Sequence, residues 1–175
     1  MKPKWWNKAK KQLSKRDIVM KKLLSVYKGH LTTRNNFFYS LTRSIISQQI
    51  SVSAADSVFS KFEKKCRGKI NPKIVSKLSI TDLRRCGLSR MKALGIKSLA
   101  DKILDKSFNP KLLKKMSDEE AINYLSTLRQ IGRWSSEMVL IFFYNRQNIW
   151  PVQDIGLLRA ISNNYKKRYL PPNSF

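Results

Sequence analysis

An all-α fold is predicted by three features of this 175-residue chain. Apolar residues recur at helical spacing in segment after segment, as in helices that bury one face. Serine, threonine or aspartate stands before several of these segments, where a helix needs an N-terminal cap. No alternating apolar and polar run is long enough to indicate a β-strand.

The first half of the chain contains five segments with helical patterning. They are residues 5–27, a segment from Phe37 whose inner face is Phe38, Leu41, Ile45 and Ile46, one capped by Ser51 or Ser53, and two more capped by Thr81 and Ser89. Residues 31–36 form a polar connection, and the stretch SQQISVS interrupts the pattern after Phe37. These interruptions place loops between helices.

The second half reads as a helical hairpin followed by one more helix. Ser117 and Glu120 have the spacing of a capping box, in which each side chain bonds the other residue's backbone N–H. The turn RQIG then leads to a helix that begins near Arg133. After a loop closed by Pro151, Asp154 is placed to cap the next helix.

The charge of the chain is strongly one-sided. Lys and Arg total 36 against 11 Asp and Glu, a net charge of +25, while 42% of residues are hydrophobic. The hydrophobic content predicts a packed core, and the charge favours a polyanionic partner, above all nucleic acid. A ribosomal-type protein, a membrane-surface binder and a genome whose proteins are generally basic remain as alternatives.

Several other classes have little support. Cys66 and Cys86 form no CxxC pair or four-cysteine set, which argues against a zinc ribbon or an iron–sulfur cluster. His30 is the lone histidine, so Ser-His-Asp catalysis is disfavoured. No signal peptide or membrane-spanning stretch is apparent. We expect a soluble intracellular protein, cytoplasmic and nucleoid-associated in a prokaryote or nuclear in a eukaryote.

The predicted hairpin, at about residues 118–143, offers a site for an anion. Its second helix opens with the free N–H groups of Gly132, Arg133 and Trp134, and the helix dipole favours a phosphate there. Arg129 adds positive charge. An ordinary αα-hairpin with no ligand is the alternative interpretation.

Four stretches together resemble one protein family. They are LSTLRQIGRWSSEMVLIFF, WPVQDIGLLRAI, RSIISQQISVSAADSVFSKF and GLSRMKALGIKSLAD. Taken in their order along the chain, they resemble the helix–hairpin–helix DNA glycosylase superfamily, nearest its 3-methyladenine DNA glycosylase II branch, which acts in alkylation repair. The resemblance implies one helical glycosylase domain over residues 1–175, with two small lobes and a cleft between them.

Two departures from the family pattern stand out. Gln130 occupies the place of the first hairpin glycine, a position that favours positive φ. The family also continues with further helix where this chain reaches PPNSF, which implies a C-terminally shortened member.

The resemblance assigns the chemistry to two residues. Asp154 matches the catalytic acid, and an ionised carboxylate would stabilise the positive charge that develops on the sugar. Trp134 stands where bifunctional members carry a lysine, which implies a hydrolytic enzyme without lyase activity. The implied base pocket contains Trp134, Met138 and Gln48. A plain N-cap for Asp154, a core aromatic for Trp134 and core packing for Met138 are the alternatives.

DNA contacts follow from the same resemblance. Gln49 would fill the hole left by the flipped base, and the other implied contacts are Ser51, Arg129, Gln130, Ile131, Gly132, Arg133 and Ser135. The carbonyls of Ser126, Leu128 and Ile131 would bind a monovalent cation, and no other cofactor is expected. The expected partner of this monomer is double-stranded DNA with alkylated bases.

The predicted function is excision of alkylated purines by base flipping and hydrolysis of the N-glycosidic bond in base excision repair. A non-catalytic helix–hairpin–helix DNA-binding module and a glycosylase of different lesion specificity are the alternatives. A glycosylase/lyase of the endonuclease III type is disfavoured by Trp134 and by the lack of four clustered cysteines.

Overall fold

The computed structural model describes residues 2–32 and 35–166, and every regular element within them is a helix. The elements are α1 (Trp6–Arg16), α2 (Ile18–Val26), α3 (Phe37–Ser47), α4 (Val52–Lys65), α5 (Pro72–Val75), α6 (Ile80–Arg85), α7 (Arg90–Leu104), the 3₁₀ helix η1 (Pro110–Lys115), α8 (Asp118–Ser126), α9 (Arg133–Phe142) and α10 (Ile155–Tyr165). The all-α prediction is confirmed. The expected shortening at PPNSF, and part of the connection at 31–36, lie outside the described residues.

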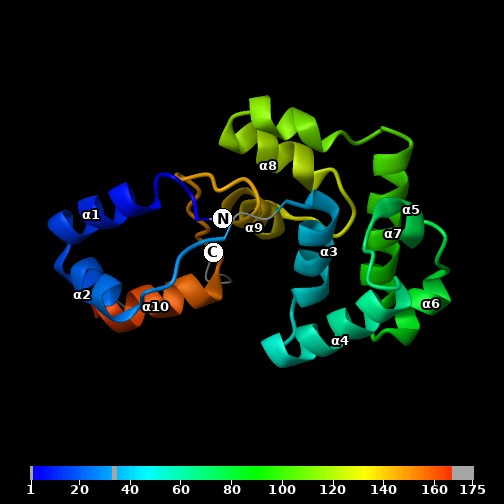
Figure 1. Ribbon diagram of the computed structural model, residues 1–175, viewed down its shortest axis with the longest axis horizontal. Coiled ribbons are helices and arrows are strands. Elements are labelled where there is room, and N and C mark those ends of the chain that lie inside the picture. The colour runs from blue at the N-terminus through cyan, green and yellow to red at the C-terminus, as the bar shows by residue number, and fades with distance from the viewer. Residues whose placement is uncertain (1, 33–34, 167–175) are drawn as a thin grey trace.

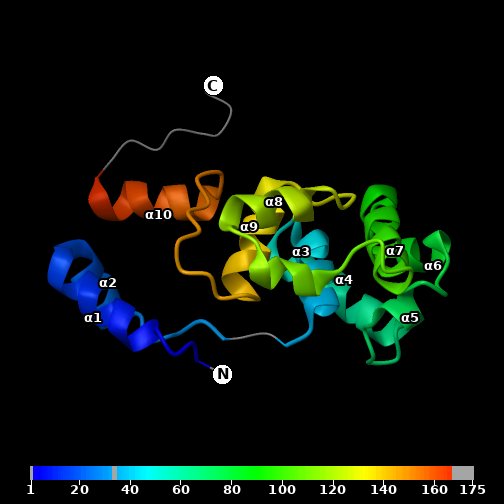
Figure 2. The ribbon, with the colours of Figure 1, turned by 90° about the horizontal axis from the view of Figure 1, so that it is seen from above.

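The helices gather into two groups (Figures 1 and 2). The large lobe contains α3 to α9, and the small lobe contains α1, α2 and α10. Helix α3 is the centre of the large lobe because it packs against α4, α7 and α9. Since α9 carries the second half of the predicted hairpin, this packing ties the hairpin to the core.

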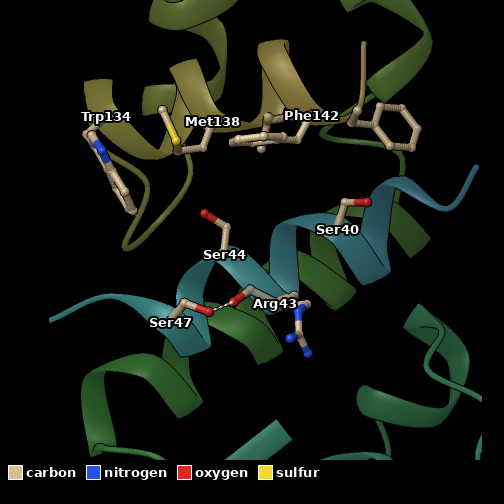
Figure 3. Close-up of a pocket in the computed structure, with 9 residues that line it drawn as sticks. Ser40, Arg43, Ser44, Ser47, Trp134, Met138 and Phe142 are labelled. Atoms are coloured by element: carbon tan, nitrogen blue, oxygen red, sulfur yellow. Dashed lines mark hydrogen bonds between the residues drawn. The ribbon is translucent and has the colours of Figure 1, made fainter. Parts of the chain in front are cut away.

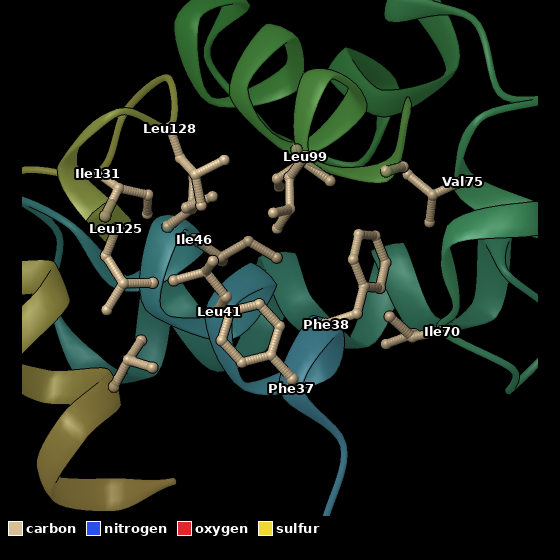
Figure 4. Close-up of a cluster of buried hydrophobic side chains, with 14 of the residues drawn as sticks. Phe37, Phe38, Leu41, Ile46, Ile70, Val75, Leu99, Leu125, Leu128 and Ile131 are labelled. Carbon is tan, nitrogen blue, oxygen red and sulfur yellow. The ribbon is translucent and has the colours of Figure 1, made fainter. Parts of the chain in front are cut away.

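The core forms around the apolar face of α3 (Figure 4). Leu41, Ile45 and Ile46 are completely buried and Phe38 is 4% exposed, as the sequence predicted. Leu125, Leu128 and Ile131 of the hairpin pack into the same cluster, which also includes Val75 and Leu99. Burial of each such side chain stabilises the fold by roughly 1.5–3 kcal/mol before entropy is counted.

Capping residues set most of the helix starts. Ser51, Ser89 and Asp154 each accept a hydrogen bond from the backbone N–H three residues on, and Ser117 with Glu120 forms the predicted capping box. The prediction of Thr81 as a cap is wrong. Ser79 starts α6 instead, because its hydroxyl accepts the N–H of Asp82 while the Asp82 carboxylate accepts the N–H of Ser79, which completes a second capping box.

The single helix predicted over residues 5–27 is two helices. Asp17 is extended, with φ −143° and ψ 119°, and its side chain accepts the N–H of Met20 to begin α2. The apolar pattern runs on across this break, which is why the sequence suggested one helix.

The small lobe is held by few contacts. No residue of α1, α2 or α10 is buried, and all three helices lie within the described ranges. The Trp5 indole donates to the Asn145 carbonyl at 3.2 Å, and the Tyr165 hydroxyl donates to Asp17 at 2.8 Å. Across the described ranges, the structure contains no helix with both the length and the apolar character to cross a bilayer.

Candidate active site

The hairpin turn contains a residue in a conformation that side chains rarely adopt. Gln130 has φ 66°, so the left-handed position expected for this turn is confirmed with glutamine in it. A left-handed residue with a Cβ costs about 1–2 kcal/mol. Gly95 of α7 lies directly against it: a Cβ on Gly95 would be 2.9 Å from Gln130 Cγ and 3.0 Å from Gln130 Cβ. Close packing therefore holds the strained turn in place.

Helix α9 begins with backbone donors that have no helical partner. Gly132 is its N-cap and supplies no side-chain cap. The first N–H groups of a helix lack carbonyls to bond within the helix, and they lie at the positive end of its dipole. This end of α9 is suited to an anion such as a phosphate.

Asp154 and Trp134 are hydrogen-bonded to each other. The indole Nε1 donates to Asp154 Oδ2 at 2.9 Å, and the Leu157 N–H donates to Oδ1 at 2.7 Å. The carboxylate is therefore an N-cap and an acceptor for the tryptophan at once, and both of its oxygens are held. Residues twenty apart in the sequence form one pair because α9 and the following loop return the chain to the hairpin.

A cavity of about 250 Å³ lies between α9 and α3. Figure 3 shows Trp134, Met138 and Phe142 side by side on α9, with the Ser44 hydroxyl pointing toward them from α3. The hydroxyls of Ser40 and Ser44 are buried and make no hydrogen bond in the described part of the chain. The cavity is thus an apolar slot with unused polar groups in its floor.

A larger open hollow, of about 970 Å³, also borders Trp134. Its walls come from the α3–α4 loop, the start of α7, the hairpin and the start of α10, and include Gln48, Gln49, Met91, Lys92, Gln130, Ser135, Gln153 and Asp154. We call this hollow the cleft. Trp134 and Ser47 line both the cleft and the cavity, so the two spaces are neighbours.

Gln48 lies on the cleft wall, and its side chain is engaged by the hairpin. Its Nε2 donates to the Gln130 carbonyl at 2.8 Å and to the Ser135 hydroxyl at 2.9 Å. Its expected role in the base pocket stays a prediction, and the structure gives it a bridging contact that the sequence did not reveal.

The predicted DNA contacts divide by exposure. Gln49, Ser51, Arg129 and Gly132 are exposed around the cleft and the turn. The side chains of two others are buried, so any DNA contact there would use the backbone, and their assignment as DNA contacts stays a prediction. Ile131 is 4% exposed because it packs in the core, and Ser135 is 3% exposed with its hydroxyl used by Gln48.

Arg133 does not present a free charge. Its guanidinium makes two bonds to Glu119, at 2.6 and 2.9 Å, and a third to Glu137 at 3.1 Å. Glu137 is buried, and burial raises the pKa of its carboxyl against the opposing effect of Arg133. An anion at this turn would therefore be bound by the backbone N–H groups and by Arg129.

Lys92 is a site residue that the sequence did not indicate. Its Nζ donates to the carbonyls of Ile46 and Gln48 at 2.9 and 2.7 Å, and burial lowers the pKa of its ammonium group. Ser40, Ser44 and Phe142 of the cavity were also missed. Serines four residues apart on a helix face were the available sign for two of them.

The expected cation site is only partly described by the contacts. The Leu128 carbonyl accepts the N–H of Ile131 at 3.1 Å, which leaves one of its lone pairs for an ion. Within residues 2–32 and 35–166, no group of three or more His, Cys, Asp and Glu side chains could hold a metal. A monovalent cation on the carbonyls of Ser126, Leu128 and Ile131 stays a prediction.

Comparisons with known proteins agree with this geometry. The chain is 32% identical over 136 residues to DNA-3-methyladenine glycosylase 1 of Schizosaccharomyces pombe, covering 76% of this chain and 57% of that protein. It is 32% identical to the DNA-3-methyladenine glycosylase of Saccharomyces cerevisiae, covering 74% and 47%. The chain thus spans about half the length of these curated relatives.

A solved structure is similar over most of both chains. The S. pombe 3-methyladenine DNA glycosylase in complex with abasic DNA superimposes with a TM-score of 0.80 at 27% identity, covering 94% of this chain and 84% of that one. Residues 42–168 match the family described as HhH-GPD superfamily base excision DNA repair protein. This match includes α9, Trp134 and Asp154, and the chain is a member of the HhH-GPD superfamily of base excision DNA repair proteins.

Proposed function

We propose that this protein is a DNA glycosylase that releases alkylated purines of the 3-methyladenine type from double-stranded DNA by hydrolysis. The observation that carries the proposal is the pair formed by Trp134 and Asp154, joined at 2.9 Å at the boundary of the cavity and the cleft. The names of the relatives support the same chemistry.

The binding step would use the apolar cavity. An alkylated purine is flat and carries positive charge, so an indole face attracts it by stacking and by a cation–π interaction. Met138 and Phe142 would complete the apolar wall, and the unused hydroxyls of Ser40 and Ser44 would bond the polar edge of the base. A normal base gains less because it is neutral.

The bond-breaking step would use the carboxylate of Asp154. When the N-glycosidic bond breaks, its electron pair leaves with the base, which departs neutral because it began as a cation. Positive charge on the sugar is then stabilised by the carboxylate. Water forms the new bond to the sugar carbon, and its proton passes to Asp154 and then to solvent.

The finer prediction of hydrolysis without strand cleavage rests on the lack of a suitable amine among the described residues that line the cleft. Trp134 has no nucleophilic nitrogen, and the Lys92 ammonium is used by two carbonyls. A Schiff base would need a free lysine beside the sugar. We expect borohydride to trap no covalent complex with DNA, whereas a trapped complex would establish lyase chemistry.

Asp154→Asn tests the catalytic assignment cleanly. Asparagine still caps a helix, so the substitution removes the charge and keeps α10 in place. We expect release of 3-methyladenine from methylated duplex DNA, measured by chromatography, to fall by at least about 100-fold. Binding of a fluorescein-labelled duplex, measured by anisotropy, should stay close to that of the unmodified protein.

Asp17→Asn is a matched control. Asp17 also caps a helix through Oδ1 and accepts an aromatic donor, Tyr165, through Oδ2, but it lies away from the cleft. This variant should retain excision. Unchanged excision by Asp154→Asn would reject the catalytic role. Binding of DNA with no release of base by the unmodified protein would instead favour a DNA-binding module.

A further inference from the structure

Lys92 occupies an unusual place for a cation. It lies in the first turn of α7, three residues after the N-cap Ser89, where the dipole of its own helix disfavours positive charge. Its side chain instead reaches the end of α3 and donates to the carbonyls of Ile46 and Gln48. Carbonyls at a helix end lack helical partners, and a cation is favoured there. The interaction that stabilises the Lys92 ammonium group is therefore with the C-terminal end of α3, and not with its own helix.

Gln48 is held by α7 on its backbone and by the hairpin on its side chain. Its backbone carbonyl accepts Lys92 at 2.7 Å, while its side-chain amide donates to Gln130 and Ser135 of the hairpin. One residue thus connects α7 to the hairpin. We call Lys92 and Gln48 the strut.

Gln49 directly follows the strut and is strained. It has φ 55°, in the left-handed region, and its side chain is exposed on the cleft. Such a conformation persists only where the surrounding structure fixes it, and it is typical of functional positions. Here the fixed neighbour is Gln48, whose backbone and side chain are both anchored.

We propose that Lys92 and Gln48 are positioning residues that hold Gln49 in the left-handed conformation from which it enters duplex DNA. The strut would couple insertion of Gln49 to docking of the hairpin, because the Gln130 carbonyl at its far end belongs to the turn that would hold the phosphate. This inference rests on the proposed function, since it concerns how a base leaves the stack before excision.

The two steps of the reaction depend differently on the strut. Neither Lys92 nor Gln48 contacts Asp154 or Trp134 through a hydrogen bond recorded for these four residues. Loss of the strut should impair eversion of a stacked base and spare cleavage of a base that is already accessible. Eversion is least costly in single-stranded DNA, where no partner strand holds the base.

The experiment compares Lys92→Met with Lys97→Met. Lys97 is a matched control: it lies on the same helix and also donates to two carbonyls, those of Ser76 and Leu78, away from the cleft. One oligonucleotide duplex is treated with dimethyl sulfate and assayed in single turnover, both as a duplex and after strand separation. Lys92→Met should slow release from the duplex by about 10- to 100-fold, the effect of losing a charged hydrogen bond.

Release from the separated strands should change far less, and Lys97→Met should leave both rates near those of the unmodified protein. An equal loss on both substrates, no loss on the duplex, or the same loss from Lys97→Met would overturn the proposal. If Lys92→Met proves unfolded by circular dichroism, Gln48→Ala is assayed in its place with the same expectation.

A second measurement reads insertion without excision. A duplex with a tetrahydrofuran abasic-site analogue carries 2-aminopurine beside the hole, and its fluorescence reports stacking at saturating protein. The unmodified protein and Lys97→Met should shift the fluorescence, and Lys92→Met should produce a smaller shift. This arm tests the strut even if the protein releases no base, so failure of the proposed function and failure of the strut are distinguishable. Equal shifts from all three proteins would refute the positioning role.

Discussion

Gly95→Ala is a test of how tightly the hairpin turn is packed on α7. In an open helix this change would stabilise the protein by about 1 kcal/mol, because glycine is the poorer helix former. At this position the new Cβ would be 2.9 Å from Gln130 Cγ, 3.0 Å from Gln130 Cβ and 3.2 Å from the Arg129 carbonyl oxygen. The contacting atoms are backbone or close to backbone, so they cannot swing away as the end of a long side chain would.

Overpacking should therefore decide the sign. Such clashes cost about 1–3 kcal/mol, and we expect the upper part of that range here because the turn is already strained. After the gain in helix propensity, the net loss should be about 1–2 kcal/mol. For a protein of this size that corresponds to a fall in Tm of about 2–8 °C, which is measurable by circular dichroism.

A double-mutant cycle separates the clash from other effects. In a Gln130→Gly background, two of the three close contacts disappear. Gly95→Ala should then cost at least about 1 kcal/mol less than in the unmodified protein. The reasoning is refuted if Gly95→Ala stabilises the protein, or if its cost is the same in both backgrounds.

Three further predictions concern stability and reactivity. Burial raises the pKa of Glu137 above its ordinary value of 4.5, so the native protein loses stability as the pH rises from 4.5 through that raised pKa. Between pH 4 and pH 7 the urea midpoint of Glu137→Gln should therefore rise relative to that of the unmodified protein. A difference in midpoint that does not vary with pH would contradict this. Arg146 bonds Asp118 at 2.6 Å and two backbone carbonyls, so Arg146→Ala should lower the free energy of unfolding in urea by about 2–3 kcal/mol. Arg146→Lys should lower it by less. Equal stability of all three proteins would show that these hydrogen bonds do not stabilise the fold. Cys66 and Cys86 are buried, and burial raises the pKa of the Cys66 thiol to about 11. Both thiols should therefore react slowly with a disulfide reagent at pH 8 until the protein is unfolded. Rapid labelling of the native protein would contradict their burial.

Local features of the fold were accessible from the sequence. The inner face of α3 and the caps at Ser51, Ser89 and Ser117 depend on residues within a few positions of one another, so a pattern suffices to predict them. The mistakes were also local. The cap of α6 is Ser79 and not Thr81 because Asp82 accepts the Ser79 N–H, and the break at Asp17 does not change the spacing of apolar residues.

The site could be predicted only in part. Asp154 and Trp134 were paired by resemblance to a family, since no local rule brings residues twenty apart together. Lys92 could not be predicted from the sequence because one lysine among many is not distinctive. Its contacts with Ile46 and Gln48 depend on where α3 ends in space. Local reasoning fails most where several elements meet, which is where function is expected.

The thinly packed small lobe has a consequence for the timescale of the site. Regions with few buried contacts open at free energies well below that of global unfolding, and α10 belongs to such a region while α9 belongs to the core. Asp154 caps α10 and Trp134 lies on α9, so their hydrogen bond joins a region whose amides should exchange rapidly to one whose amides should exchange slowly. The time that the carboxylate spends in its working position would then depend on how often α10 separates from the pair of helices α1 and α2, to which the Tyr165 hydroxyl bonds it through Asp17.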